Sequence, residues 1–210
     1  ARSNRYMVVS DDPIKLTITN WPAGQVEWFD CPLNPAEPEG ATRKVPFTGE
    51  LLIDRADFME DAPKKFFRLK PDGEVRLKYT YIIKCNEVIK DAEGNVTELE
   101  CTYDPATKAG SGFSERKVKG TIHWVSAAHA TKCEARLYEQ LVDEERNINP
   151  NSLTVMEECY VEPALAEAKP GDRFQFVRHG YFGVDLKDTT SDKLVFNRIV
   201  SLKSSFKLPN

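Results

Sequence analysis

The sequence predicts an all-β fold: two small antiparallel β-barrels in tandem, with few short helical turns. Apolar and polar residues alternate in several segments, and this period of two is typical of half-buried strands. Turn-forming residues separate these segments, and helical periodicity is scarce. The chain has 210 residues. Two barrels of roughly 100 residues each fit the usual size of a domain better than one large barrel, which stays the alternative.

The alternation defines most of the strands. Ile14, Leu16 and Ile18 share one face of a strand expected over 14–20. A long hairpin is expected from two alternating runs, 75–83 and 96–103, joined by a turn at 91–95 whose residues tolerate left-handed backbone. Further strands are expected over 118–124, 174–176, 181–184 and 194–200.

Only two short helical turns are expected. Asp54 is a suitable N-cap for one or two turns over 54–60, and residues 127–130 predict another. Prolines are frequent in residues 30–39, which predicts an irregular surface loop there.

The composition is that of an ordinary soluble protein, with 40% hydrophobic and 30% charged residues. No run of about 18 apolar residues exists, and no apolar segment follows the first residues, so neither a membrane span nor a signal peptide is expected. The chain does not begin with Met, which suggests a fragment or a processed form. The five cysteines lack any C-x-x-C pair and are expected to be reduced thiols in a cytoplasmic protein: Cys31, Cys85, Cys101, Cys133 and Cys159.

The charge is unevenly distributed along the chain. The formal net charge is −4, which argues mildly against a nucleic-acid-binding protein. Residues 64–90 nevertheless hold eight basic and three acidic residues, so that this window is net +5. Such asymmetry predicts either a positive binding face on an acidic body or a merely solvated charged face.

The sequence contains no recognisable catalytic or metal-binding motif. His123 and His129 are six residues apart, a spacing that suits neither a helical metal pair nor a zinc finger, and His179 is isolated. The Gly-x-Ser-x-Gly, P-loop and dinucleotide-binding signatures are missing. We therefore expect no catalytic residue, metal site or bound cofactor in this chain.

Several side chains are of the kinds that read unpaired RNA bases. Gln175 lies between Phe174 and Phe176, so strand alternation points its amide away from both rings. An amide offers a donor and an acceptor to a pyrimidine edge, and the fork of Arg178 suits guanine or phosphate. Basic and aromatic residues are mixed in the segment 64–68. Arg76 and Lys78 are two positions apart and therefore share one face of their strand. Ordinary solvated surface residues are the alternative interpretation.

Many collinear motifs resemble the anticodon-binding region of class I glutaminyl-tRNA synthetases, from Arg5 to about Lys203. The matching segments are 45–47, 53–58, 73–78, 101–104, 117–130, 134–138, 149–153, 174–185 and 196–203. The resemblance implies two β-barrels, distal and proximal to a catalytic body. It suggests a distal barrel over 22–118 and a proximal barrel made of 1–21 and 119–210, with approximate boundaries.

The resemblance also implies a set of anticodon-binding residues. Arg5 and Gln175 match residues that hold the central uracil. Arg68 and Arg178 match basic residues near the third base, a guanine, whereas Arg76 and Lys78 match the pocket of the first base. Three positions depart from the family pattern. Lys65 replaces a glutamine that helps to read the central base, and we expect Lys65 to reach a carbonyl oxygen or phosphate instead. Phe67 replaces a lysine, and Ala36 replaces an asparagine.

The resemblance implies a parent enzyme that attaches glutamine to its tRNA with ATP and Mg²⁺. The class I ATP-binding signatures are missing from these residues. The chain is therefore expected to catalyse nothing, and to work with its own N-terminal catalytic domain and the anticodon loop of tRNA(Gln), as a monomer that contacts no membrane.

Three alternatives stay open. The first is the anticodon domain of an archaeal- or eukaryote-type glutamyl-tRNA synthetase, although segments 122–129 and 196–198 favour glutamine. The second is a stand-alone ribosomal barrel protein that binds 5S RNA, a non-enzymatic RNA-binding β-barrel protein, although such proteins have a single barrel. The third is a β-rich protein-interaction module, which predicts no salt-dependent binding of tRNA.

Overall fold

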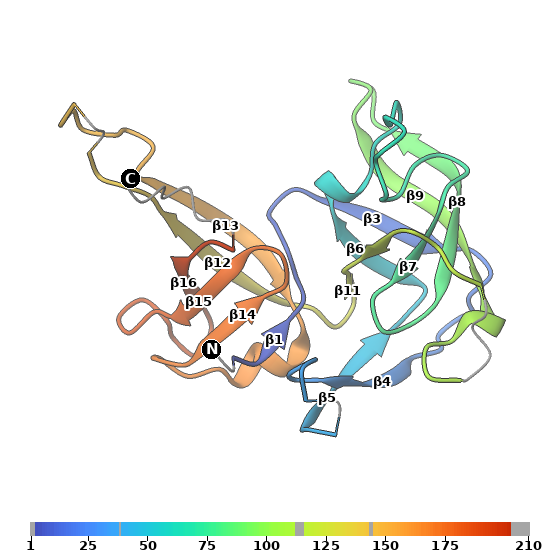
Figure 1. Ribbon diagram of the computed structural model, residues 1–210, viewed down its shortest axis with the longest axis horizontal. Coiled ribbons are helices and arrows are strands. Elements are labelled where there is room, and N and C mark those ends of the chain that lie inside the picture. Colours follow the sequence, from blue (N-terminus) through green and yellow to red (C-terminus); the bar gives the residue numbers. More distant parts are fainter. Residues whose placement is uncertain (1–2, 38, 112–115, 143–144, 203–210) are drawn as a thin grey trace. The chain divides into compact units, whose positions relative to one another are not determined.

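The computed structural model describes residues 3–37, 39–111, 116–142 and 145–202 (Figure 1). The chain forms two compact units. Unit 1 comprises Ala1–Asp11, Pro32–Ala41 and Thr131–Asn210, and unit 2 comprises Asp12–Cys31 and Thr42–Ala130. Residues 12–21 and 119–130 thus lie in unit 2, although the sequence-based division grouped them with the chain ends. The proximal and distal assignment of the barrels stays a prediction. Lys203 lies outside the described residues.

Unit 1 is built on a seven-stranded sheet. In spatial order its strands are β1 (Arg5–Tyr6), β14 (Arg173–Phe176), β15 (Gly180–Val184), β16 (Leu194–Val200), β12 (Thr131–Tyr138), β13 (Leu153–Val161) and β2 (Val8–Val9). The two edge strands, β1 and β2, are separated in the sequence by Met7 alone. Because one residue spans at most about 3.6 Å, the edges of this sheet must lie near each other, and the sheet must curl.

Unit 2 repeats this arrangement in a second seven-stranded sheet. Its strands in spatial order are β10 (Thr121–Ile122), β7 (Glu74–Leu77), β8 (Ile82–Lys90), β9 (Val96–Asp104), β3 (Pro13–Ile18), β6 (Glu50–Asp54) and β11 (Val125–Ser126). Its edge strands are separated by only His123 and Trp124. A two-stranded sheet of β4 (Glu27–Pro32) and β5 (Thr42–Phe47) accompanies it.

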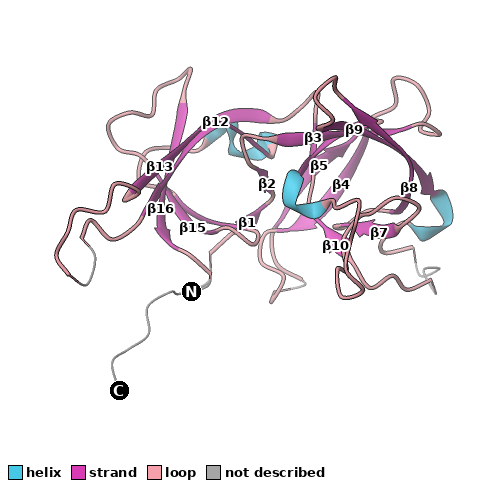
Figure 2. Cartoon of the chain, turned by 90° about the horizontal axis from the view of Figure 1, so that it is seen from above, coloured by secondary structure: helices cyan, strands magenta, loops and turns pink. Residues whose placement is uncertain are grey.

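The all-β prediction is confirmed, with one sheet nearly closed into a barrel and another forming a half-barrel. Most ladders are antiparallel, but β1–β14, β10–β7, β12–β16 and β3–β9 are parallel. In the described residues helical structure is limited to three 3-10 turns, shown in cyan in Figure 2: η1 (Arg55–Asp57), η2 (Pro105–Thr107) and η3 (Pro163–Glu167). None of the helical segments in the described residues has the length and hydropathy needed to cross a membrane.

Each unit has its own aromatic core. In unit 1 the ring of Phe176 packs on Phe182 and Phe196, with centroid distances of 4.6 and 5.1 Å. In unit 2 the ring of Phe47 makes edge contacts with Trp21 and Trp124 at 4.9 and 5.0 Å. Buried aromatic pairs of this kind stabilise a core by about 0.5–1.5 kcal/mol beyond the burial of their area. All five cysteines are buried free thiols, as the sequence predicts.

The strands predicted over 96–103 and 194–200 form as β9 and β16, and the strand predicted over 14–20 forms as β3 but ends at Ile18. The predicted continuous strand over 75–83 is wrong, because β7 ends at Leu77 and a tight turn leads into β8. In this turn Tyr79 has a left-handed backbone with φ of 69°. The hydroxyl of Thr80 donates to the carbonyl of Leu77 over 3.1 Å. The strand predicted over 118–124 is likewise reduced to the two residues of β10.

Candidate nucleic-acid interface

Arg5 and Gln175 are neighbours on adjacent parallel strands of unit 1. They are direct register partners of β1 and β14, although 170 positions separate them in the sequence. Backbone bonds fix the register on both sides: the amide of Gln175 donates to the carbonyl of Asn4 over 2.9 Å, and that of Val177 donates to Tyr6 over 3.0 Å. Register partners project to the same side of a sheet, so the two side chains lie on one face.

The polar groups of this pair have spare hydrogen-bonding capacity. Phe176 is in the core, and alternation places Gln175 on the opposite side of β14, as predicted. Gln175 is nevertheless buried, with 8% of its surface exposed. Its side-chain amide has no hydrogen bond with any described residue, and the buried Nε of Arg5 also lacks a partner among them. A buried polar group normally finds a partner, so the Nε of Arg5 in particular suits a polar ligand on this face.

Arg178 lies in the turn between β14 and β15, because β14 ends at Phe176 and β15 begins at Gly180. The amide of His179 donates to the carbonyl of Phe176 over 3.0 Å and closes the turn. Arg178 is exposed and has a left-handed backbone with φ of 68°. A side chain pays a conformational cost in this region, and such strain is frequent at functional sites.

Arg76 and Lys78 lie on the outer side of β7 and its extension in unit 2. The guanidinium of Arg76 donates to the carbonyl oxygens of Thr80 and Thr107, over 3.0 and 2.9 Å. These bonds tie the turn that follows β7 to η2. The amide of Lys78 donates to Ile122 over 2.9 Å, and its ammonium lies 4.8 Å from the centroid of the Tyr79 ring. Arg76 thus holds the turn in which Lys78 is presented.

Lys65 and Arg68 belong to one closed loop, residues 59–68, which we call the basic loop. The stem of the loop is a bridge between Phe58 and Leu69. Arg68 strengthens the stem: its guanidinium donates to the carbonyl of Ala56 over 2.8 Å and lies 3.4 Å from the fully buried carboxylate of Asp57. Arg68 therefore has a structural role as well as its charge.

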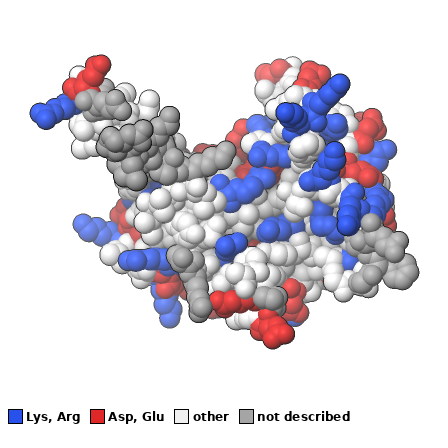
Figure 3. All heavy atoms as spheres, in the orientation of Figure 1, with Lys and Arg blue, Asp and Glu red and all other residues white. Residues whose placement is uncertain are grey.

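Lys65 is at the tip of the basic loop. The amide of Phe66 donates to the carbonyl of Pro63 over 2.9 Å, so Lys64 and Lys65 are the central residues of a tight turn. Both are exposed, and neither has a carboxylate partner among the described residues. Figure 3 shows many Lys and Arg side chains on the visible face of unit 2. Unpaired cations at a loop tip are well suited to phosphate.

Gly120 and Lys119, which were not among the predicted site residues, support this loop. A Cβ atom at Gly120 would lie 2.2 Å from the carbonyl oxygen of Phe67, so the two backbones are in direct contact. The ammonium of Lys119 lies over the Phe67 ring, 5.3 Å from its centroid. The only sequence signal was a basic residue followed by glycine in a segment of strand-like alternation.

Comparisons with known proteins identify the family of this chain. Residues 3–104 match the anticodon-binding domain of class I tRNA synthetases for glutamate and glutamine, and residues 121–185 match a second anticodon-binding domain of the same class. The chain belongs to this family. The two matches together reach both compact units.

Its curated relatives include three bacterial glutamine–tRNA ligases. The protein of Clostridium perfringens is 55% identical over 207 residues, which are 94% of this chain and 37% of the relative. That of Rhodopirellula baltica is 52% identical, with coverages of 93% and 34%, and that of Pseudomonas putida is 50% identical, with coverages of 92% and 36%. The chain thus spans little more than a third of the length of these relatives.

Proposed function

We propose that this chain is the anticodon-recognition region of a glutamine–tRNA ligase and binds the anticodon loop of tRNA(Gln). The whole protein would attach glutamine to this tRNA with ATP and Mg²⁺, in a catalytic domain N-terminal to these residues. The similarity to glutamine–tRNA ligases, at about 50% identity, supports glutamine over the glutamate alternative. The observation that carries the proposal is the Arg5–Gln175 pair, which offers unused hydrogen-bonding groups on one rigid face.

This pair suits the central uracil of the anticodon. Uracil presents one N–H donor and carbonyl acceptors on its pairing edge. The amide of Gln175 supplies both an acceptor and donors, and the guanidinium of Arg5 supplies donors only. A wrong base leaves a buried donor or acceptor unpaired, at a cost of about 1–3 kcal/mol for each group. Discrimination thus arises from unsatisfied polar groups and needs no steric exclusion.

We assign the other candidate anticodon-binding residues to the first base, the third base or the RNA backbone. We assign Arg178 and Arg68 to the third base, with Arg68 also supporting the basic loop through Ala56 and Asp57. Arg76 and Lys78 are assigned to the first base, where Arg76 positions the turn and Lys78 meets the RNA. Lys65, exposed at its loop tip, would contact a phosphate or a base carbonyl.

The proposal includes a cytoplasmic, monomeric protein that makes no contact with membranes. Five buried free thiols support a reducing compartment, where disulfides are rare. We assign no catalytic step and no cofactor to this chain itself.

The test is fluorescence anisotropy of this chain with a glutamine-tRNA anticodon stem-loop and with a loop whose central uracil is changed, at two salt concentrations. We expect salt-sensitive binding that prefers uracil. Gln175→Ala should weaken binding about 5- to 100-fold and remove the preference, by the cost of an unpaired buried group. Gln140→Ala, an exposed glutamine of the same unit, is the control and should bind like the unsubstituted chain.

Two results would count against the proposal. A Gln175→Ala chain that retains both affinity and preference would remove this residue from the central-base pocket. Failure of the unsubstituted chain to bind either the loop or whole tRNA would overturn the proposal as a whole.

A further inference from the structure

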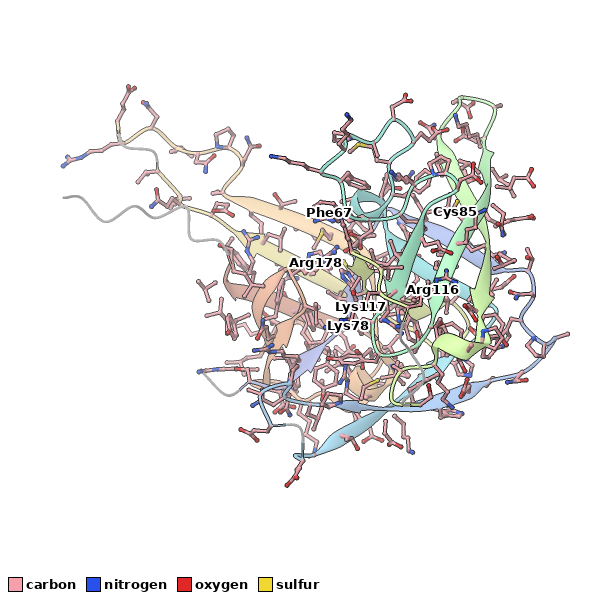
Figure 4. The ribbon with its side chains drawn as sticks, turned by 45° about the vertical axis from the view of Figure 1, so that its right-hand side comes forward. Phe67, Lys78, Cys85, Arg116, Lys117 and Arg178 are labelled. Carbon is pink, nitrogen blue, oxygen red and sulfur yellow. The ribbon has the colours of Figure 1, made fainter. Side chains whose placement is uncertain are left out.

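The basic loop of unit 2 exposes an aromatic ring that the sequence pattern of the family does not account for. Phe67 stands where a lysine is expected, and half of its surface, 50%, is exposed. Its neighbour Phe66 is less exposed, and the Arg68 guanidinium lies 6.0 Å from the centroid of the Phe66 ring. Figure 4 labels Phe67 in the segment that connects β6 to β7. Of the two adjacent rings in the loop, Phe67 is therefore the more accessible to a ligand.

The backbone beneath Phe67 is fixed. Gly120 is in direct contact with the Phe67 carbonyl group, where a Cβ atom would also lie 3.2 Å from the Val75 side chain. Gly120 is itself held by β7, since its carbonyl accepts from the amide of Arg76 over 2.9 Å. At the other end, the amide of Leu69 donates to Asp57 over 3.0 Å, and that of Met59 donates to Leu69 over 3.2 Å. An exposed ring on so constrained a loop needs little further ordering when it binds a ligand.

The surroundings of the ring are cationic. The Lys119 ammonium lies over the ring, and Lys64 and Lys65 are exposed three and two positions before it. An exposed aromatic ring among lysines matches single-stranded nucleic acid, which offers a flat base for stacking and a phosphate for each cation. An apolar protein partner would gain nothing from the three ammonium groups, which it would have to desolvate.

We infer that Phe67 is a stacking residue for an unpaired base of the anticodon loop, and that Lys119 contacts the adjacent phosphate. The inference rests on the proposed function and adds to it a contact independent of the Arg5–Gln175 pair. Stacking is tolerant of base identity, because every base has a flat aromatic face. Phe67 therefore contributes affinity and holds the loop open, whereas Gln175 contributes discrimination.

The experiment compares Phe67→Ala, Phe67→Leu and Phe67→Trp for binding to an anticodon stem-loop that carries 2-aminopurine at successive loop positions. Stacking quenches 2-aminopurine, so one position should lose fluorescence with the unsubstituted chain. We expect Phe67→Ala and Phe67→Leu to weaken binding about 5- to 100-fold and to abolish the quenching, and Phe67→Trp to retain both. The preference for the central uracil should survive in all three chains.

Trp28→Ala is the matched control, because Trp28 is an aromatic residue of the same unit with 51% of its surface exposed. It should bind RNA like the unsubstituted chain. The inference is overturned if Phe67→Ala binds within about two-fold of the unsubstituted chain, if Phe67→Leu retains the affinity, or if Trp28→Ala loses as much. Loss of the proposed function looks different, since the unsubstituted chain would then show neither binding nor quenching.

Discussion

The two candidate RNA-binding regions are constructed differently. In unit 1, Arg5 and Gln175 are fixed by the ladder between β1 and β14, so their spacing is a property of the sheet. In unit 2, Lys65 and Phe67 are presented by a loop whose position depends on a few hydrogen bonds and on contact with Gly120. A ladder suits the reading of hydrogen-bond edges, which requires accurate geometry. A constrained loop suffices for stacking and charge, which tolerate small displacements.

The largest expected difference concerns stability. Phe176→Ala should cost about 3–5 kcal/mol, because Phe176 is almost fully buried and its removal leaves a cavity beneath β14. Phe67→Ala, at an exposed position, should change stability by no more than about 0.5 kcal/mol. Chemical denaturation of both chains measures this. Similar stabilities for the two variants would contradict the assignment of one ring to the core and the other to the surface.

An intermediate effect is expected where the loop meets the strand edge. Gly120→Ala would place a Cβ atom 2.2 Å from a backbone oxygen, so the basic loop must shift. Overpacking of this kind costs about 1–3 kcal/mol, and the shift should also lower RNA affinity through Phe67 and Lys65. Denaturation and anisotropy on the same samples give both quantities.

Gly183→Ala on β15 is the control for this substitution. A Cβ atom there would make only ordinary contacts, the nearest at 3.5 Å from the Ile199 side chain. If Gly120→Ala behaved like this control in both measurements, the loop would not depend on the backbone contact.

The contrast between ladder and loop also explains what could be predicted from the sequence. Alternation located β3, β9 and β16, because side chains on a half-buried strand must alternate. It failed at the end of β7, since Val75, Leu77, Tyr79 and Tyr81 remain in phase although the chain turns. No glycine, proline or asparagine marks that turn, and Tyr79 adopts its positive φ because Arg76 and Thr80 hold the turn through side-chain bonds.

The candidate site was likewise predictable where strands position its residues and unpredictable where a loop positions them. The resemblance indicated Arg5 and Gln175 as members of one pocket, and the structure pairs them across one ladder. It could not indicate that Arg68 supports the loop through Asp57, or that Gly120 and Lys119 flank Phe67. These contacts join segments about 10 and 50 positions apart and depend on the path of a loop. No periodicity in the sequence encodes such a path.

The smallest expected effect is a gain in stability at the turn between β14 and β15. Arg178 has φ of 68°, a conformation that glycine adopts with little strain. Arg178→Gly should therefore stabilise unit 1 by about 0.5–1 kcal/mol while it lowers RNA affinity by removing a cation. Arg178→Ala loses the same cation but keeps the strain, so it should lose affinity without gaining stability. If Arg178 serves RNA binding and strains its turn, Arg178→Gly should raise the stability of unit 1 and lower RNA affinity. Arg178→Ala should lower RNA affinity only. Equal stability of the two variants would show that the turn carries no strain that glycine can relieve, and the case for a functional arginine would then rest on RNA affinity alone.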